Sequence, residues 1–171
     1  YPCNIMLIAS MNPCRCGYYG DGTGRCKCGQ AQVSQYLGKV SGPLLDRIDL
    51  HIEVSPVQYR DLESSKPAES SAEIKKRVDK ARRIQTQRYE GLNIFSNSQL
   101  TPSLIHKYCA LGDAEKSIMK SAFERLGLSA RAHNRILKVA RTIADLDNSE
   151  KITVNHLAEA IQYRSLDRKF W

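Results

Sequence analysis

The sequence predicts a mainly α-helical protein, in which a C-terminal helical bundle follows a partial α/β segment with a cysteine-rich loop. Residues 5–9 form an unbroken apolar run, which is typical of a strand covered on both faces of a sheet. Four cysteines follow within residues 14–28, in a glycine-rich stretch that offers turns but no regular element. From residue 71 onward, apolar side chains recur at the spacing of helical faces. They predict buried stripes at Ile74, Val78, Ala81 and Ile84, and at Ala132, Ile136, Val139, Ala140 and Ile143.

The composition is that of a globular, basic chain. Of its 171 residues 42% are hydrophobic, which suffices for a core of ordinary size. The formal net charge is +8, and residues 56–171 hold 21 Lys and Arg against 14 Asp and Glu. This excess predicts an anionic partner such as nucleic acid, although a solvated basic surface explains it equally well. No apolar run reaches the roughly 20 residues that cross a bilayer, so we expect a cytoplasmic protein with no membrane partner.

The first apolar run ends at Asn12, where a buried parallel strand would present its chemistry. The four cysteines that follow are Cys14, Cys16, Cys26 and Cys28. These two Cys-x-Cys pairs supply the four thiolates of a closed tetrahedral zinc site, although Cys-x-x-Cys is the usual spacing. Nearby Arg and Lys side chains would offset the negative charge of four thiolates. The alternative is four reduced thiols without a metal.

Further elements follow from local patterns. A short helix is expected over residues 31–37, the chain breaks at 41–43, and alternation over residues 48–54 predicts a half-buried strand. Polar residues 56–70 form a linker between a first region, 1–55, and a helical region, 71–171. Helices are expected over 71–89, 102–108, 113–127 and 130–145, and after Thr153, with N-cap or C-cap residues at Ser70, Thr101, Gly127 and Ser129.

Catalytic templates are absent from the sequence. There is no phosphate-binding Gly-x-x-x-x-Gly-Lys loop, no zinc-protease histidine pair and no nucleophile elbow. The four histidines are scattered. By themselves, the remaining polar groups at element ends identify no activity.

Three motifs together resemble the magnesium-chelatase-like AAA+ ATPases, in the branch of the bacterial ComM and YifB proteins. They are Met6-Leu7-Ile8-Ala9-Ser10-Met11-Asn12-Pro13-Cys14-x-Cys16-Gly17-Tyr18, Ser41-Gly42-Pro43-Leu44-Leu45-Asp46-Arg47-Ile48-Asp49-Leu50, and Leu126-Gly127-Leu128-Ser129-Ala130-Arg131-Ala132. The resemblance extends to Arg164. It implies an ATPase core remnant over 1–55 and a helical lid over 71–171. The family commonly has proline where this chain has Arg15, which changes loop stiffness but not the number of thiols.

The resemblance also implies roles for four residues. Asn12 matches the sensor-1 position, which orients the attacking water, and Arg47 matches the arginine finger that reaches the neighbouring subunit's nucleotide. Arg131 matches sensor 2, with Arg135 a second candidate for nucleotide binding. Without the family, Asn12 is a turn residue, Arg47 a local ion-pair partner of Asp46 or Asp49, and the other two a basic helix face.

The parent protein is accordingly expected to be an ATP- and Mg²⁺-dependent homo-hexamer that acts on DNA in recombination or competence. Its phosphate loop and magnesium-binding motif are expected upstream of residue 1, so this chain alone should not hydrolyse ATP. The strand between the two predicted strands would be missing as well, which predicts poor order or abnormal pairing over residues 1–65. A non-enzymatic, zinc-stabilised helical module that binds nucleic acid is the main alternative, and a magnesium chelatase subunit is a lesser one.

Overall fold

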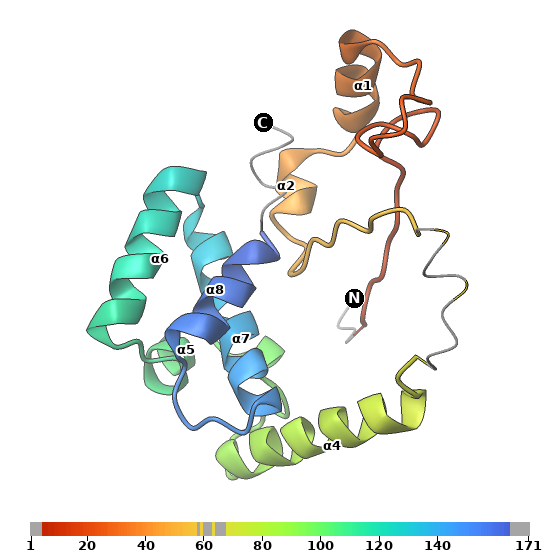
Figure 1. Cartoon of the computed structure of the whole chain (residues 1–171). Helices are drawn as coiled ribbons and strands as arrows, with labels where there is room; N and C mark the ends of the chain where they lie inside the picture. The colour runs from red at the N-terminus through yellow and green to blue at the C-terminus, as the bar shows by residue number, and fades with distance from the viewer. Residues whose placement is uncertain (1–4, 58, 60–62, 64–67, 165–171) are drawn as a thin grey trace.

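The computed structural model describes residues 5–57, 59, 63 and 68–164 (Figure 1). The elements are α1 (Gln30–Leu37), α2 (Gly42–Leu45), α4 (Ser71–Arg88), the short 3₁₀ helix η1 (Asn97–Gln99), α5 (Pro102–Tyr108), α6 (Asp113–Leu126), α7 (Ala130–Leu146) and α8 (Val154–Gln162). Helix α7 is the centre of the bundle, because it packs against α8, α4, α5 and η1. Helix α6 packs against α8. The C-terminal helical bundle expected from the sequence is therefore present.

The bundle has one continuous apolar core. Ile136 and Ala140 of α7 and Leu157 of α8 are completely or almost completely buried in it. The predicted apolar stripe of α7 faces this core, with Val139 and Ile143 half-buried at its margin. Truncation of a buried Ile or Leu to Ala typically costs about 2–5 kcal/mol, so this stripe accounts for a large part of the bundle's stability.

Helix boundaries follow the capping residues. The Ser70 side chain accepts a hydrogen bond from the Glu73 amide at 3.3 Å, and the Ser70 amide donates to Glu73 Oε2 at 3.0 Å, which completes the predicted capping box. Ser129 accepts from the Ala132 amide at 3.1 Å and begins α7. Gly127 ends α6 at φ +61°, a left-handed conformation that glycine adopts without strain.

The two predicted strands are not formed, since the described residues contain no strand. Residues 5–9 and 48–54 run mostly as irregular chain, with Ile8 82% and Val54 85% exposed. A strand is stable only when a neighbour satisfies its backbone groups, and neither segment has one here. The α/β character expected for the first region is thus absent from the described structure, which there contains only α1, α2 and loops.

Two further expectations are corrected. Ile74 and Val78 were expected to lie on the buried face of α4, but they are 44% and 43% exposed, because no described element covers the first half of this helix. The expected chain break at 41–43 instead begins α2, with Pro43 in its first turn, where proline is tolerated. The limits of the 56–70 linker remain a prediction, since several of its residues lie outside the described ranges.

None of the described helices is both long and apolar enough to cross a membrane.

Candidate functional site

Residues 45–51, which carry Arg47, dock onto the helical bundle. Asp46 Oδ1 accepts a hydrogen bond from the Ser129 hydroxyl, the N-cap of α7, at 2.9 Å. The His51 amide donates to the Tyr163 carbonyl at 2.8 Å. His51 Nε2 lies 3.2 Å from the Leu45 carbonyl oxygen and closes the segment on itself. The segment is therefore joined to the start of α7 and to the residue after α8.

Two arginines of the bundle strengthen this junction. Arg135 of α7 forms an ion pair with Asp49. Arg164, whose side chain is almost completely buried, donates to the Ile48 carbonyl and lies 3.8 Å from Asp46. Residues more than 80 positions apart in the sequence thus hold the segment in one orientation. Since the contacts include ion pairs and a backbone hydrogen bond, the geometry is specified more tightly than by apolar packing alone.

Arg47 is left available by this arrangement. Its guanidinium donates to the Pro43 carbonyl at 2.7 Å, and its side chain is exposed. Asp46 and Asp49 are both engaged by the bundle instead, so within the described structure Arg47 forms no ion pair with either aspartate. The local ion pair that was the alternative interpretation of Arg47 is absent.

Arg131 and Arg135 differ in whether they have an ion-pair partner. Arg131 lies in the first turn of α7, is exposed, and has no hydrogen bond or ion pair with any described residue. Arg135, one turn later, is committed to Asp49. Of the two candidates for a nucleotide contact, Arg131 is the free cation.

Asn12 lies away from this junction, at the start of the cysteine loop. It is exposed, and a Cβ placed on Gly17 would come within 3.9 Å of its amide group. No hydrogen bond or ion pair among the described residues connects Asn12 with Arg47 or Arg131. The three predicted nucleotide-responsive residues are therefore not brought together here, and their roles remain predictions.

The four loop cysteines converge, as the sequence predicts. All four sulfur atoms lie within 4.8 Å of one another. The Sγ–Sγ distances are 3.3 Å for Cys14–Cys16, 3.6 Å for Cys16–Cys26, 3.5 Å for Cys16–Cys28 and 3.9 Å for Cys14–Cys26. Four sulfurs bound tetrahedrally at Zn–S of about 2.3 Å stand ~3.8 Å apart. The cluster therefore has the ligand number, ligand type and size of a structural zinc site.

The electrostatics of the cluster favour a cation. Burial of Cys14 opposes its ionisation, but hydrogen bonds from the Cys16 thiol and from neighbouring backbone amides outweigh burial and lower the pKa of Cys14 to about 6. For Cys26, the backbone hydrogen bond from Cys28 favours the thiolate, yet burial and the adjacent Cys16 and Cys14 sulfurs raise its pKa to about 12. One thiolate thus suppresses ionisation of its neighbours. A divalent ion would remove this mutual repulsion.

Interactions within the loop support the cluster. Asp21 accepts hydrogen bonds from the Thr23 amide and hydroxyl, and Arg25 pairs with Asp21 at 3.1 Å. The Arg25 guanidinium also lies 4.3 Å from the centre of the Tyr18 ring. These contacts bridge the two cysteine pairs and orient the turn between them.

Sequence reasoning missed the polar interior of the bundle. Asp145, which is 0% exposed, accepts hydrogen bonds from Arg88 at 2.9 Å, Asn97 at 2.8 Å and Arg141 at 3.2 Å. Asn97 in turn accepts from the Tyr89 hydroxyl at 2.6 Å. The i, i+4 spacing of Arg141 and Asp145 was a possible signal, but helical spacing does not say that such a pair is buried. The sequence likewise predicts only a capping role for Ser129 and no role for Arg164.

Comparison with known proteins places these features in a family. The model of the magnesium chelatase subunit ChlI C-terminal domain matches residues 68–164, and that of magnesium chelatase subunit ChlI matches residues 1–62. The competence protein ComM of Haemophilus influenzae is 40% identical over 169 residues, and protein YifB of Escherichia coli is 42% identical over 170. An uncharacterised protein of Mycobacterium tuberculosis is 30% identical over 164 residues.

These alignments cover 96–98% of this chain but 32% of each relative, so the chain spans about a third of the length of the curated relatives it matches. The regions matched include both the segment that carries Arg47 and the helical bundle. The chain belongs to the magnesium chelatase ChlI family.

Proposed function

We propose that this chain is the nucleotide-responsive part of an ATP-driven motor of the AAA+ type that acts on DNA. The observation that carries the proposal is the junction between residues 45–51 and the start of α7, because it fixes an exposed Arg47 and an exposed Arg131 to one rigid bundle. A motor needs its parts to move as a unit when nucleotide is bound or hydrolysed. Neither cation is in an ion pair with a described residue, so both can donate hydrogen bonds to phosphate oxygens.

Arg47 would act on nucleotide held by a neighbouring subunit of a homo-hexamer. Its planar guanidinium can donate two parallel hydrogen bonds to phosphate oxygens, and an arginine supplied this way typically raises turnover by 10³–10⁵-fold. The engagement of Asp46 and Asp49 by the bundle supports this role, because it leaves the Arg47 charge uncompensated.

Arg131 would contact nucleotide bound in its own subunit, as a sensor of the γ-phosphate. Its place in the first turn of α7 supports this, since movement of that helix would be transmitted directly to residues 45–51. Asn12 would orient the attacking water. ATP and Mg²⁺ would be held by residues outside this chain, which carries no phosphate-binding loop of its own.

The experiment is a chimera in which this chain replaces the matching third of Haemophilus influenzae ComM, with ATP turnover as the readout. Arg131→Ala should lower turnover by at least ten-fold, because it removes a contact to phosphate. Arg125→Ala on α6 is the matched control, since it removes the same charge from an exposed helix position and should leave turnover unchanged. Equal turnover in the two variants would contradict the proposal.

A zinc-stabilised module that binds nucleic acid without hydrolysing ATP is the second candidate, favoured by the geometry of the four cysteines. The chimera distinguishes the two candidates. DNA binding that persists with no ATP turnover in the unmutated chimera supports the module, whereas turnover that depends on Arg131 supports the motor.

A further inference from the structure

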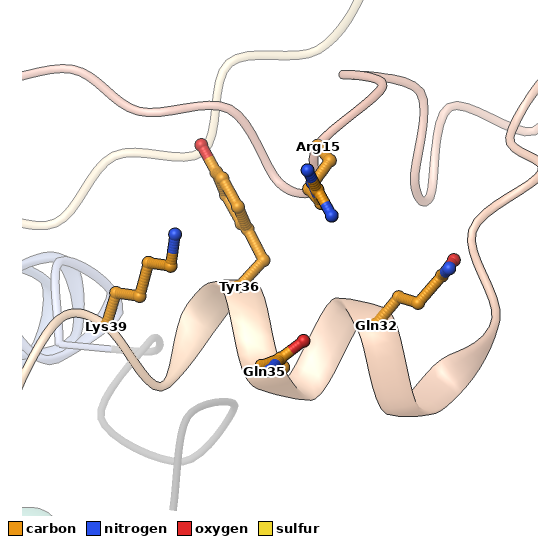
Figure 2. Close-up of a pocket in the computed structure, with 5 residues that line it drawn as sticks. All are labelled: Arg15, Gln32, Gln35, Tyr36 and Lys39. Carbon is orange, nitrogen blue, oxygen red and sulfur yellow. The ribbon is translucent and has the colours of Figure 1, made fainter.

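A pocket of about 210 Å³ lies between the cysteine loop and α1 (Figure 2). Its lining residues are Arg15, Gln32, Gln35, Tyr36 and Lys39. Arg15 comes from the cysteine loop, and the others come from α1 and the turn that follows it. Two cations, two amides and a phenol thus surround the pocket, and no carboxylate lines it.

The two cations of the pocket are uncompensated. Within the described part of the chain, neither Arg15 nor Lys39 forms an ion pair. Asp21, the acidic residue of the adjacent loop, is occupied by Thr23 and by Arg25 at 3.1 Å. A concave site with two free positive charges and no negative one attracts an anion, and the glutamine amides can donate further hydrogen bonds to its oxygens.

Aromatic rings accompany these charges. In Figure 2 Tyr36 projects from α1 between Lys39 and Arg15. On the cysteine loop, Tyr19 is 42% exposed and its hydroxyl lies 3.3 Å from Gln30 Oε1 at the start of α1, whereas Arg25 covers one face of the Tyr18 ring. Proteins that bind single-stranded nucleic acid combine cations, which contact the sugar-phosphate backbone, with aromatic rings on which the bases stack. The pocket is too small for a duplex but has room for one phosphate.

The cysteine cluster adjoins this pocket through Arg15. Arg15 lies between Cys14 and Cys16, both members of the cluster, so the backbone on either side of Arg15 is fixed when the sulfurs share one ion. Without the ion, the Asp21 contacts, the Arg25–Tyr18 contact and the Tyr19–Gln30 hydrogen bond remain, but none of them involves Arg15. Metal binding would therefore position Arg15 opposite α1.

We propose that this pocket, together with the exposed Tyr19 that contacts the start of α1, binds the phosphate backbone of single-stranded nucleic acid, and that the metal-bound cysteine loop holds it in shape. The inference deepens the proposed action on DNA by naming the surface, and it rests on that proposal. A free nucleotide would offer the same phosphate chemistry, but it would not extend to Tyr19.

Helix α4 offers the competing basic surface. Its exposed cations Lys76, Lys80 and Arg83 form no ion pair among the described residues, and their spacing places them on one helix face. Unlike the pocket, this face carries no aromatic residue over positions 76–83. Helix α4 also lies at the opposite end of the molecule from α1 in Figure 1, so the two surfaces can be tested separately.

The test is fluorescence anisotropy of the zinc-loaded chain with a labelled 12-nucleotide oligo-dT, over a range of salt concentrations and without ATP. Arg15→Ala combined with Lys39→Ala should weaken binding at least ten-fold and lower the salt slope by about 1.4, the value for two phosphate contacts on a single strand. The control is Lys116→Ala with Lys120→Ala on α6, which changes the net charge equally. Tyr36→Ala should weaken binding several-fold and Tyr36→Phe should restore it, because the ring does the stacking.

Three results would overturn the proposal. The first is equal binding and an equal salt slope in the pocket and control variants. The second is loss of binding in the Lys76→Ala/Lys80→Ala/Arg83→Ala variant while the pocket variant binds normally. The third is competition by ATP or pyrophosphate at the same concentration as the oligonucleotide. Circular dichroism of each variant checks that the helices remain folded. Because no ATP hydrolysis is measured, failure here leaves the motor proposal standing. Loss of turnover in the chimera is a separate result, so the two failures are distinguishable.

Discussion

Asp145 is the residue on which the polar interior of the bundle depends. It connects Arg88 at the end of α4, Asn97 of η1 and Arg141 of its own helix, and no solvent reaches it. Removing one member of a buried ion-pair network leaves the others charged or polar without partners, which typically costs about 3–5 kcal/mol. Asp145→Ala should therefore lower the free energy of unfolding by this amount in urea titrations. Asp147→Ala, at an exposed position nearby, should cost under about 1 kcal/mol, and an equal loss in both would show that the network is unimportant.

Cys109 should make stability fall at alkaline pH. Burial raises the pKa of the Cys109 thiol to about 11, whereas in the unfolded chain it is close to 9. The folded state thus holds this proton more tightly than the unfolded chain. The resulting stabilisation of the folded state is complete below pH 9 and is lost as pH rises toward 11, on the order of 2 kcal/mol in all. Unfolding titrations at pH 8 and pH 10.5 should show this loss in the natural chain and a smaller one in Cys109→Ala. The same pH dependence in both would contradict the assignment.

At the scale of elements, the cysteine loop should be organised by zinc. The four sulfur atoms already stand at distances that suit one tetrahedral ion. Metal analysis of protein purified without chelator should find one zinc per chain, and the Cys14→Ser, Cys26→Ser variant should lose it, because only two thiolates remain. Cys109→Ser, which changes a buried thiol of the bundle, should keep the metal. Full zinc occupancy in the double variant would refute the four-cysteine site.

The helices were the most predictable elements, because their signals are local. The capping box at Ser70, the left-handed Gly127 and the Ser129 cap were all expected from the sequence, and each begins or ends its helix as predicted. The two strands were not, since strand formation depends on a neighbour that no local pattern supplies. The resemblance to a family did imply that the strand between them would be missing, and residues 5–9 and 48–54 form no strand in the described structure. The predicted burial of Ile74 and Val78 was wrong for the same reason. An apolar stripe shows which face of a helix is apolar, but not whether another element covers that face.

The sequence predicted individual residues of the site but not how they are arranged. The four cysteines converge as their spacing suggested. The sequence does not show that Arg135 has an ion-pair partner while Arg131 has none, because the Asp49–Arg135 pair joins residues far apart in the sequence. Long-range ion pairs depend on the fold, and neither spacing nor composition encodes them.

At the scale of the whole molecule, the bundle and the first region should differ in stability. Amides of α7 and α8 lie in a continuous buried core and should exchange slowly with deuterium, whereas those of residues 5–9 have no helix or strand to protect them. The His51 amide should be an exception within residues 48–54, since it donates to Tyr163. Hydrogen exchange followed by mass spectrometry measures this. Uniform protection across the bundle and both segments would contradict the division.

The proposed function requires that Arg47 acts on nucleotide held by a neighbouring subunit. The most direct test mixes two variants of the ComM chimera, one with Arg47→Ala and one whose own phosphate-binding loop is disabled. Each variant alone should be inactive, and mixed hexamers should recover part of the ATP turnover, because an intact Arg47 can then face an intact nucleotide site across a subunit boundary. Full turnover by Arg47→Ala alone, or no recovery on mixing, would contradict the claim.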